Sequence, residues 1–257
     1  MTDRLAPATL GLLLLAVWEG LTRWLAVPVY VLPGPVASLG ALIEDRVLLG
    51  TSLLATLKIA VLALLAAVSL GGLLAVLFAQ SRIAERALFP YAVILQVTPI
   101  VAIAPLILIW VDSVTFALLI CAWIVAFFPV LSNTVLGLNS ADRNLVELFQ
   151  LYGATRWQTL WLLRLPSALP YFLAGLRVAG GLALIGAVVA EFVAGAGGTG
   201  SGLAFRILEA GYQLKVPRMF AALALISACG IAIFALLGGL QHVLLRRWHA
   251  SSMRHEN

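Results

Sequence analysis

The sequence is poor in charged residues. Of its 257 residues, 63% are hydrophobic and only 11% are charged, and the mean hydropathy is +1.08. A soluble domain of this length would contain about 25% charged residues. The composition therefore excludes an ordinary soluble domain. Apolar runs of about 20 residues favour membrane-spanning helices over the alternating pattern of an outer-membrane barrel.

Lysine is nearly absent, and this excludes a nucleotide-hydrolysing site. The two lysines are Lys58 and Lys215, and neither follows a glycine. A GxxxxGK[ST] phosphate-binding loop requires a Gly-Lys pair. The glycine-rich run at 195–202, GAGGTGSG, lacks this lysine and is predicted to be a flexible turn. We therefore expect the chain to hydrolyse no ATP by itself and not to be an enzyme.

Cysteine and histidine are also scarce. Cys121 and Cys229 lie inside apolar runs, where a thiol behaves as a small packing residue. The three histidines, His242, His249 and His255, have no metal-ligand spacing. We expect no metal or other cofactor in this chain. The net charge of +5 is attributed to arginines beside membrane ends rather than to nucleic-acid binding.

The apolar runs predict an all-α polytopic membrane protein with one transmembrane domain over residues 1–257. An amphipathic helix at 35–49 is expected to lie at the membrane surface, and a polar loop is expected at 195–216. The third span is unusual because it contains Pro90, Pro99 and Pro105. The six predicted spans are residues 7–25, 52–79, 87–111, 114–136, 171–194 and 217–245.

Six spans place both termini on the same side of the membrane. With the termini in the cytoplasm, the positive-inside rule is obeyed by nine basic residues to six. The cytoplasmic set is Arg4, Arg82, Arg86, Arg143, Arg156, Arg164, Arg246, Arg247 and Arg254. The opposite set is Arg23, Arg46, Lys58, Arg206, Lys215 and Arg218. Arg177 lies within the fifth span and is expected to reach the cytoplasmic interface.

The segment 139–170 is too polar for lipid, and this topology places it in the cytoplasm. Asp142 is a good helix cap, and apolar residues then recur on one helical face. Gly153 is a natural left-handed end for this first helix. The apolar face consists of Leu145, Leu148, Phe149 and Tyr152.

A second helix follows, capped by Thr155, and Pro166 and Pro170 are expected to end it. A short amphipathic helix of the first kind suits a groove on a partner protein. The alternative is an ordinary connecting loop that packs on its own bundle.

Glu147 is followed by Gly153 after six residues and by Leu165-Pro166 after a further 12 and 13. This spacing resembles the EAA signature of bacterial ABC importer permeases, although Leu148 and Phe149 replace the two small residues expected after the glutamate. The resemblance implies coupling helices that dock on separate subunits, which bind ATP and Mg. It assigns this contact to Glu147, Leu148, Phe149, Tyr152, Gly153, Ala154, Arg156 and Pro166.

Three further segments extend the resemblance over most of the chain: LPGP at 32–35, TPIVAIAPLILIW at 98–110, and LPSALPYFLAGLRVAGGLALIGAVVAEFVAG at 165–195. They resemble the nitrate/sulfonate/taurine group of permeases, which includes permeases for thiamine-precursor pyrimidines and riboflavin-like compounds. The resemblance implies a type I importer of the bacterial inner membrane. Its expected partners are a second copy of the chain in a homodimer, two ATP-binding subunits and a periplasmic substrate-binding protein.

Polar and irregular positions inside the spans are candidates for the solute pathway or its gate. They are Gln96, Thr98, Pro99 and Pro105 in the third span and Glu191 in the fifth. For the third span the alternative is a kink needed only for packing. For Glu191 the alternative is a solvated side chain near the end of its span. No cluster of cations lies at membrane depth, which favours a neutral aromatic heterocycle over nitrate or a sulfonate as the solute.

Two other functions compete with the importer subunit. A stand-alone ion-coupled carrier is expected to show inverted repeats with broken helices at matching positions, and no such repeat is evident. A membrane enzyme or scaffold is the third possibility. The sequence offers no nucleophile–base pair or metal-ligand cluster at membrane depth for an enzyme.

Overall fold

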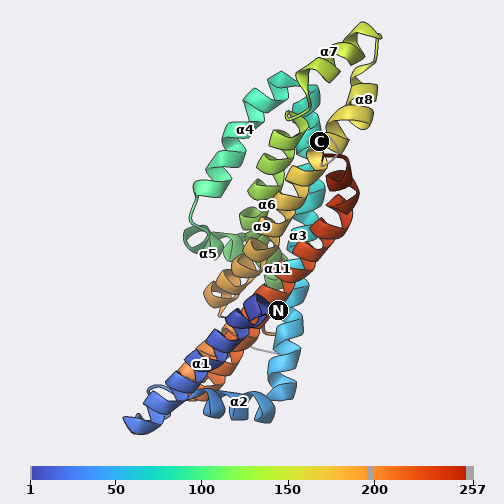
Figure 1. Cartoon of the computed structure of the whole chain (residues 1–257). Helices are drawn as coiled ribbons and strands as arrows, with labels where there is room; N and C mark the ends of the chain where they lie inside the picture. Colours follow the sequence, from blue (N-terminus) through green and yellow to red (C-terminus); the bar gives the residue numbers. More distant parts are fainter. Residues whose placement is uncertain (1, 196–199, 253–257) are drawn as a thin grey trace. The chain divides into compact units, whose positions relative to one another are not determined.

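The computed structural model describes the backbone of residues 2–195 and 200–252 and the side chains of 9–195 and 200–246. The regular structure of these residues is helical throughout (Figure 1). The chain divides into two compact units, which are described separately. Unit 1 contains Met1–Thr56 and Gly195–Ala228, and unit 2 contains Leu57–Ala194 and Cys229–Asn257.

Four described helices are long and apolar enough to cross a membrane: α3 (Arg46–Gln80), α6 (Val114–Leu138), the helical run Arg156–Ala194 and residues Val216–Arg246 of α11 (Val216–Ser252). The bent pair of α4 (Arg82–Val97) and α5 (Ile100–Trp110) is a fifth candidate. The first predicted span, 7–25, falls on α1 (Thr2–Trp24), and the side chains of residues 1–8 lie outside the described part. The all-α membrane fold predicted from composition is confirmed.

Unit 1 contains α1, α2 (Pro35–Glu44), the first turns of α3, α10 (Leu203–Tyr212) and the first turns of α11. Its core is formed by Leu49, Leu203, Ala221 and Ala222, each at most 1% exposed. The Leu203 N–H donates to Thr56 Oγ1 at 2.9 Å and so satisfies a free amide at the start of α10. This contact fixes α10 on α3 within the unit.

The surface helix predicted at 35–49 is shorter in the structure, because α2 ends at Glu44 and α3 begins at Arg46. Asp45 lies between the two helices and has a ψ near 18°. Its carboxylate accepts two hydrogen bonds from Arg218, at 2.5 and 2.8 Å. The boundary between α2 and α3 therefore coincides with an ion pair between residues 173 positions apart in the sequence. Hydrophobic periodicity had predicted that the surface helix continues to residue 49.

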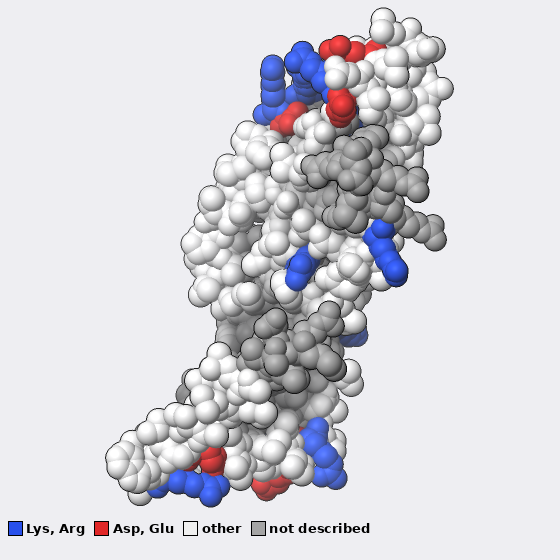
Figure 2. All heavy atoms as spheres, in the orientation of Figure 1, with Lys and Arg blue, Asp and Glu red and all other residues white. Residues whose placement is uncertain are grey.

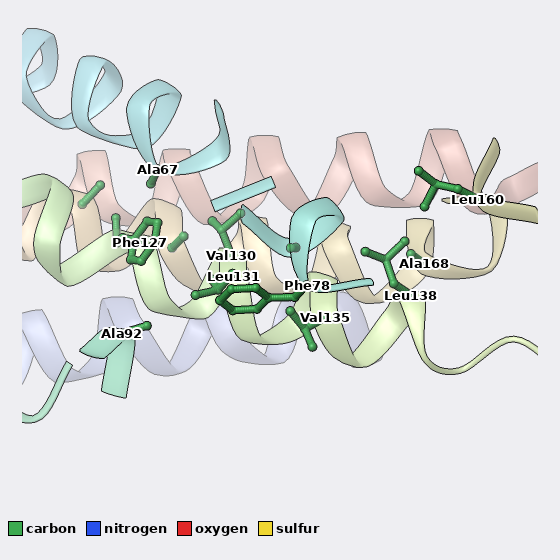
Figure 3. Close-up of a cluster of buried hydrophobic side chains, with 14 residues drawn as sticks. Ala67, Phe78, Ala92, Phe127, Val130, Leu131, Val135, Leu138, Leu160 and Ala168 are labelled. Carbon is green, nitrogen blue, oxygen red and sulfur yellow. The ribbon is translucent and has the colours of Figure 1, made fainter. Parts of the chain in front are cut away.

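The core of unit 2 lies where α3, α6 and α9 (Leu165–Ala194) pack together. Phe78 of α3 and Val130 and Leu131 of α6 are at most 2% exposed and meet in this core (Figure 3). α6 and α9 pack against each other along much of their length. They come this close because small residues face one another along the contact.

Gly175 of α9 tests this close packing. A Cβ at Gly175 would lie 2.7 Å from the Pro129 carbonyl oxygen and 2.7 Å from Asn133 Cβ, both on α6. We expect Gly175→Ala to lower the free energy of unfolding by about 1–3 kcal/mol through overpacking. Gly181→Ala on the same helix is the matched control, because a Cβ there meets no atom within 4 Å. Denaturant unfolding of both variants in detergent measures the difference, and equal stabilities would contradict the packing argument.

The third predicted span, 87–111, is not one helix. It is divided between α4 (Arg82–Val97) and α5 (Ile100–Trp110), which meet at 102°. Thr98 and Pro99 both have extended backbone, with ψ of 122° and 117°. A proline disfavours helical geometry in the residue before it, so the break falls at Thr98. Pro90 and Pro105 lie inside helices that continue through them.

The prediction that Pro166 and Pro170 end the second helix of segment 139–170 is wrong. α8 (Arg156–Thr159) continues through the π-helical turn η1 (Leu160–Arg164) into α9, which extends to Ala194. The Leu165 N–H donates to the Leu160 carbonyl, five residues earlier. This wider turn immediately precedes Pro166. Proline has no backbone N–H, so it cannot donate an α-helical hydrogen bond. The fifth helix therefore starts well before residue 171.

Candidate functional site

Segment 139–170 forms a helix, a corner and a second helix, as its caps predict. Asp142 accepts the Asn144 N–H at 2.8 Å and starts α7 (Arg143–Leu151). Gly153 follows with φ of +69°, a conformation that glycine adopts without the strain of a Cβ. Thr155 and Gln158 then form a reciprocal capping box at the start of α8. Figure 1 shows α7 and α8 projecting beyond the ends of α6 and α9.

Much of the apolar face of α7 is exposed at the surface of unit 2. Leu148 is 45% exposed and Tyr152 is 84% exposed, whereas Phe149 is half-buried. Leu151, which the periodicity argument omitted, is 85% exposed and belongs to the same surface. Its position three residues after Leu148 was the available signal. An exposed apolar surface on a short projecting helix can fill a groove of another protein.

The charged residues of this segment have different roles. Arg143 and Glu147 form an ion pair at 3.5 Å, with side chains 91% and 61% exposed, so the pair contributes little stability. Arg156 was predicted to meet a partner. In the structure its Nη1 donates to the Gln80 carbonyl at 3.4 Å, and Arg164 Nη1 donates to the Ala79 carbonyl at 3.2 Å.

These two carbonyls belong to the last turn of α3, where helix carbonyls have no partner within the helix. Two arginines of segment 139–170 therefore hold it against the end of a long helix. Ala154 and Pro166, the remaining members of the predicted contact, are half-buried. The predicted contact set thus contains exposed residues and residues that pack or bond against the rest of unit 2.

The pathway candidates do not form one enclosed site. Gln96, Pro99 and Pro105 are exposed, and Thr98 Oγ1 donates to the Ile94 carbonyl at 2.7 Å. Glu191 is 4% exposed, which rules out the alternative of a solvated side chain.

The α9 turn that carries Glu191 packs against α5. Ala104, Cys121 and Ala190 form a buried cluster there, with Ile100 and Val193 beside it. The broken span and Glu191 therefore belong to the same end of unit 2. In the structure α5 contacts the α9 turn that carries Glu191. The exposed Gln96 side chain is not part of this contact.

Arg177, which is predicted to reach the cytoplasmic interface, has an aromatic neighbour in the structure. Its guanidinium carbon lies 3.7 Å from the centroid of the Phe234 ring of α11. Its Nε is buried and has no hydrogen-bond partner within the described residues. A cation over an aromatic ring is stabilised by the ring quadrupole. A charge near the middle of an apolar helix was the signal that should have marked it as a candidate.

Among the described residues, no group of three or more His, Cys, Asp or Glu side chains is arranged to hold a metal ion. The groups that remain for chemistry are the projecting α7 surface, the buried Glu191 and the half-buried Arg177. These can support docking, gating or solute contact.

Comparison with known proteins agrees with this architecture. Residues 67–249 match the family model described as "Binding-protein-dependent transport system inner membrane component". A crystal structure of an amino acid ABC transporter with histidines has the same fold, with a TM-score of 0.64 and 20% identity over 80% of this chain and 96% of that chain.

Several full-length relatives are also permeases. The formylaminopyrimidine transport permease protein ThiX of Halalkalibacterium halodurans is 36% identical over 94% of this chain and 95% of its own. The riboflavin transport system permease protein RibX of Chloroflexus aurantiacus is 35% identical over 95% and 90%. The taurine transport system permease protein TauC of Escherichia coli is 30% identical over 95% and 90%.

These matches cover nearly the whole chain and both of its units. Permeases of this kind lack an ATPase site of their own and work with ATPase and substrate-binding subunits. The chain therefore belongs to the family of binding-protein-dependent transport system inner membrane components, the multi-pass permease subunits of ABC transporters.

Proposed function

We propose that this chain forms, as a homodimer, the translocation pathway of an ABC importer of the bacterial inner membrane. Two separate subunits bind ATP and Mg, and a periplasmic binding protein delivers the solute. Both termini and segment 139–170 lie in the cytoplasm, in agreement with the distribution of arginines. The observation that carries the proposal is the projecting α7 surface on a chain without a Gly-Lys phosphate loop.

Energy reaches the pathway through segment 139–170. α7 docks through Leu148, Leu151 and Tyr152, while Gly153 sets the angle between α7 and α8. Arg156 and Arg164 connect the second helix to the end of α3. Because α8, η1 and α9 are continuous, movement of the docked segment is transmitted directly into the helix that carries Glu191.

Glu191 acts in this proposal as part of the outer gate. It is buried where α5 packs on α9, so a change in the bend between α4 and α5 alters its surroundings. A carboxylate at membrane depth is costly unless its polar contacts are maintained. The gate is therefore expected to be closed or open, with few intermediate positions.

The solute is proposed to be an aromatic nitrogen heterocycle, such as a pyrimidine or a vitamin precursor. Support comes from the higher identity to the ThiX and RibX permeases, 36% and 35%, than to the TauC permease, 30%. The buried surroundings of Arg177 add to this, because its guanidinium already stacks on Phe234 and an aromatic ring can stack in the same way.

The cognate binding protein tests this choice. We expect formylaminopyrimidine or riboflavin to raise its melting temperature, because a ligand at 100 times its Kd adds about 2.7 kcal/mol to the stability of the folded state. Taurine and nitrate at the same concentration are the controls and are expected to leave the melting temperature unchanged. A shift with taurine or nitrate alone would contradict the heterocycle assignment while leaving the importer assignment intact.

A further inference from the structure

A polar pocket of about 490 Å³ lies between the attached side of segment 139–170 and the junction of α3 with α4. Three arginines line it, together with two amides and two hydroxyls, and its lining contains no acidic residue. The polar lining residues are Gln80, Ser81, Arg82, Gln150, Arg156, Thr159 and Arg164. A pocket of this composition has a positive potential and favours an anion.

Two of the three cations are held in place. Arg156 and Arg164 donate to carbonyls of the last turn of α3, and each guanidinium has five N–H donors, of which this bond uses one. Arg82, at the first position of α4, lines the same pocket. Positioned guanidinium groups suit the oxygens of a phosphate, which they can bind through paired hydrogen bonds.

The surroundings of the pocket are those of a membrane surface. α3, which is apolar enough to cross a membrane, ends here, and α4 begins here. Ile83 is 82% exposed beside Arg82, and Trp157 and Trp161 are 60% and 65% exposed beside Arg156 and Arg164. Tryptophan is enriched at the level of lipid headgroups. On the face shown in Figure 2, charged side chains gather at this end of unit 2, above a largely uncharged flank.

The docking surface of α7 faces a different direction. Gln150 and Val146 line the pocket, whereas Leu148 belongs to the exposed apolar face. Gln150 is two residues from Leu148, roughly 200° around the helix. A protein seated on the apolar face of α7 would therefore leave the pocket on the opposite side, next to the membrane.

We propose that this pocket binds the phosphate of an anionic phospholipid. The guanidinium groups hold the phosphate oxygens, and the acyl chains lie along the apolar exterior beside Ile83 and Trp161. Basic pockets between helices at a membrane surface bind lipid headgroups in this way. The proposal goes beyond the transport function, since it needs neither solute nor ATPase.

The test is lipid binding to the purified full chain, measured by native mass spectrometry with added phosphatidylglycerol. Arg82→Gln removes one cation from the pocket and is expected to weaken phosphatidylglycerol binding about fivefold. Arg86→Gln is the matched control: it removes the same charge from the same helix, at an exposed position that does not line the pocket. It is expected to retain wild-type binding, and phosphatidylcholine is expected to bind both variants alike.

Other outcomes are equally informative. Equal loss in the Arg82 and Arg86 variants would overturn the pocket as the site and leave only a general attraction to basic ends. Displacement of phosphatidylglycerol by millimolar inorganic phosphate would show that the pocket takes a free anion and would overturn the lipid assignment. A wild-type thermal unfolding profile for Arg82→Gln excludes loss of fold as the cause of weaker binding.

Discussion

Replacing Tyr152 with alanine is expected to weaken association with the ATP-binding subunits by about thirtyfold, which corresponds to roughly 2 kcal/mol. Tyr152 is 84% exposed at the end of α7, immediately before the Gly153 corner. Large aromatic side chains at the centre of an interface typically contribute this much, because they bury a wide apolar surface at low entropic cost. Titration of the purified permease with the ATP-binding subunit measures the affinity.

Tyr212→Ala is the matched control. Tyr212 is 88% exposed at the end of α10, so the substitution removes an equally accessible ring from unit 1 rather than from segment 139–170. It is expected to leave the affinity unchanged. The Tyr152 variant should also lose most solute-stimulated ATP hydrolysis in the reconstituted complex. Wild-type affinity for Tyr152→Ala would refute α7 as the docking helix.

Replacing Asp45 with alanine is expected to lower the free energy of unfolding by about 3 kcal/mol. Asp45 and Arg218 form a two-point ion pair with side chains 17% and 14% exposed. Losing the carboxylate leaves the largely buried guanidinium without its counter-charge. The resulting loss of folding free energy is larger than the loss caused by breaking an exposed ion pair. Denaturant unfolding in detergent measures the change.

Glu44→Ala removes a neighbouring carboxylate that is exposed, and it is expected to change stability by no more than about 0.5 kcal/mol. A double variant, Asp45→Leu with Arg218→Leu, distinguishes the net contribution of the ion pair from the cost of leaving one buried charge unpaired. It is expected to recover most of the stability, because an apolar pair buries no unpaired charge. A loss in the double variant equal to the sum of the losses in Asp45→Leu and Arg218→Leu alone would rule out a coupled pair.

The helix boundaries at the start of segment 139–170 could be predicted without a structure, because they depend on local interactions. The caps at Asp142 and Thr155 and the left-handed Gly153 are each settled by a few consecutive residues. Such preferences depend on backbone dihedrals and nearby hydrogen bonds, so they need few distant contacts. The same locality explains the error at Pro166, since a π-helical turn relieved the proline at a point that no propensity marks.

The sequence by itself determined the all-α membrane fold, the absence of a phosphate loop and the amphipathic projecting helix, because composition, motif spacing and helical periodicity are properties of the chain alone. Only the tertiary structure decided which groups meet: Arg156 and Arg164 with α3 carbonyls 76 and 85 residues earlier, and Arg218 with Asp45 across 173. It also decided that Glu191 is buried and that Arg177 stacks on Phe234. Such partners depend on which helix faces pack together, and the packing is set by the whole bundle rather than by neighbouring residues.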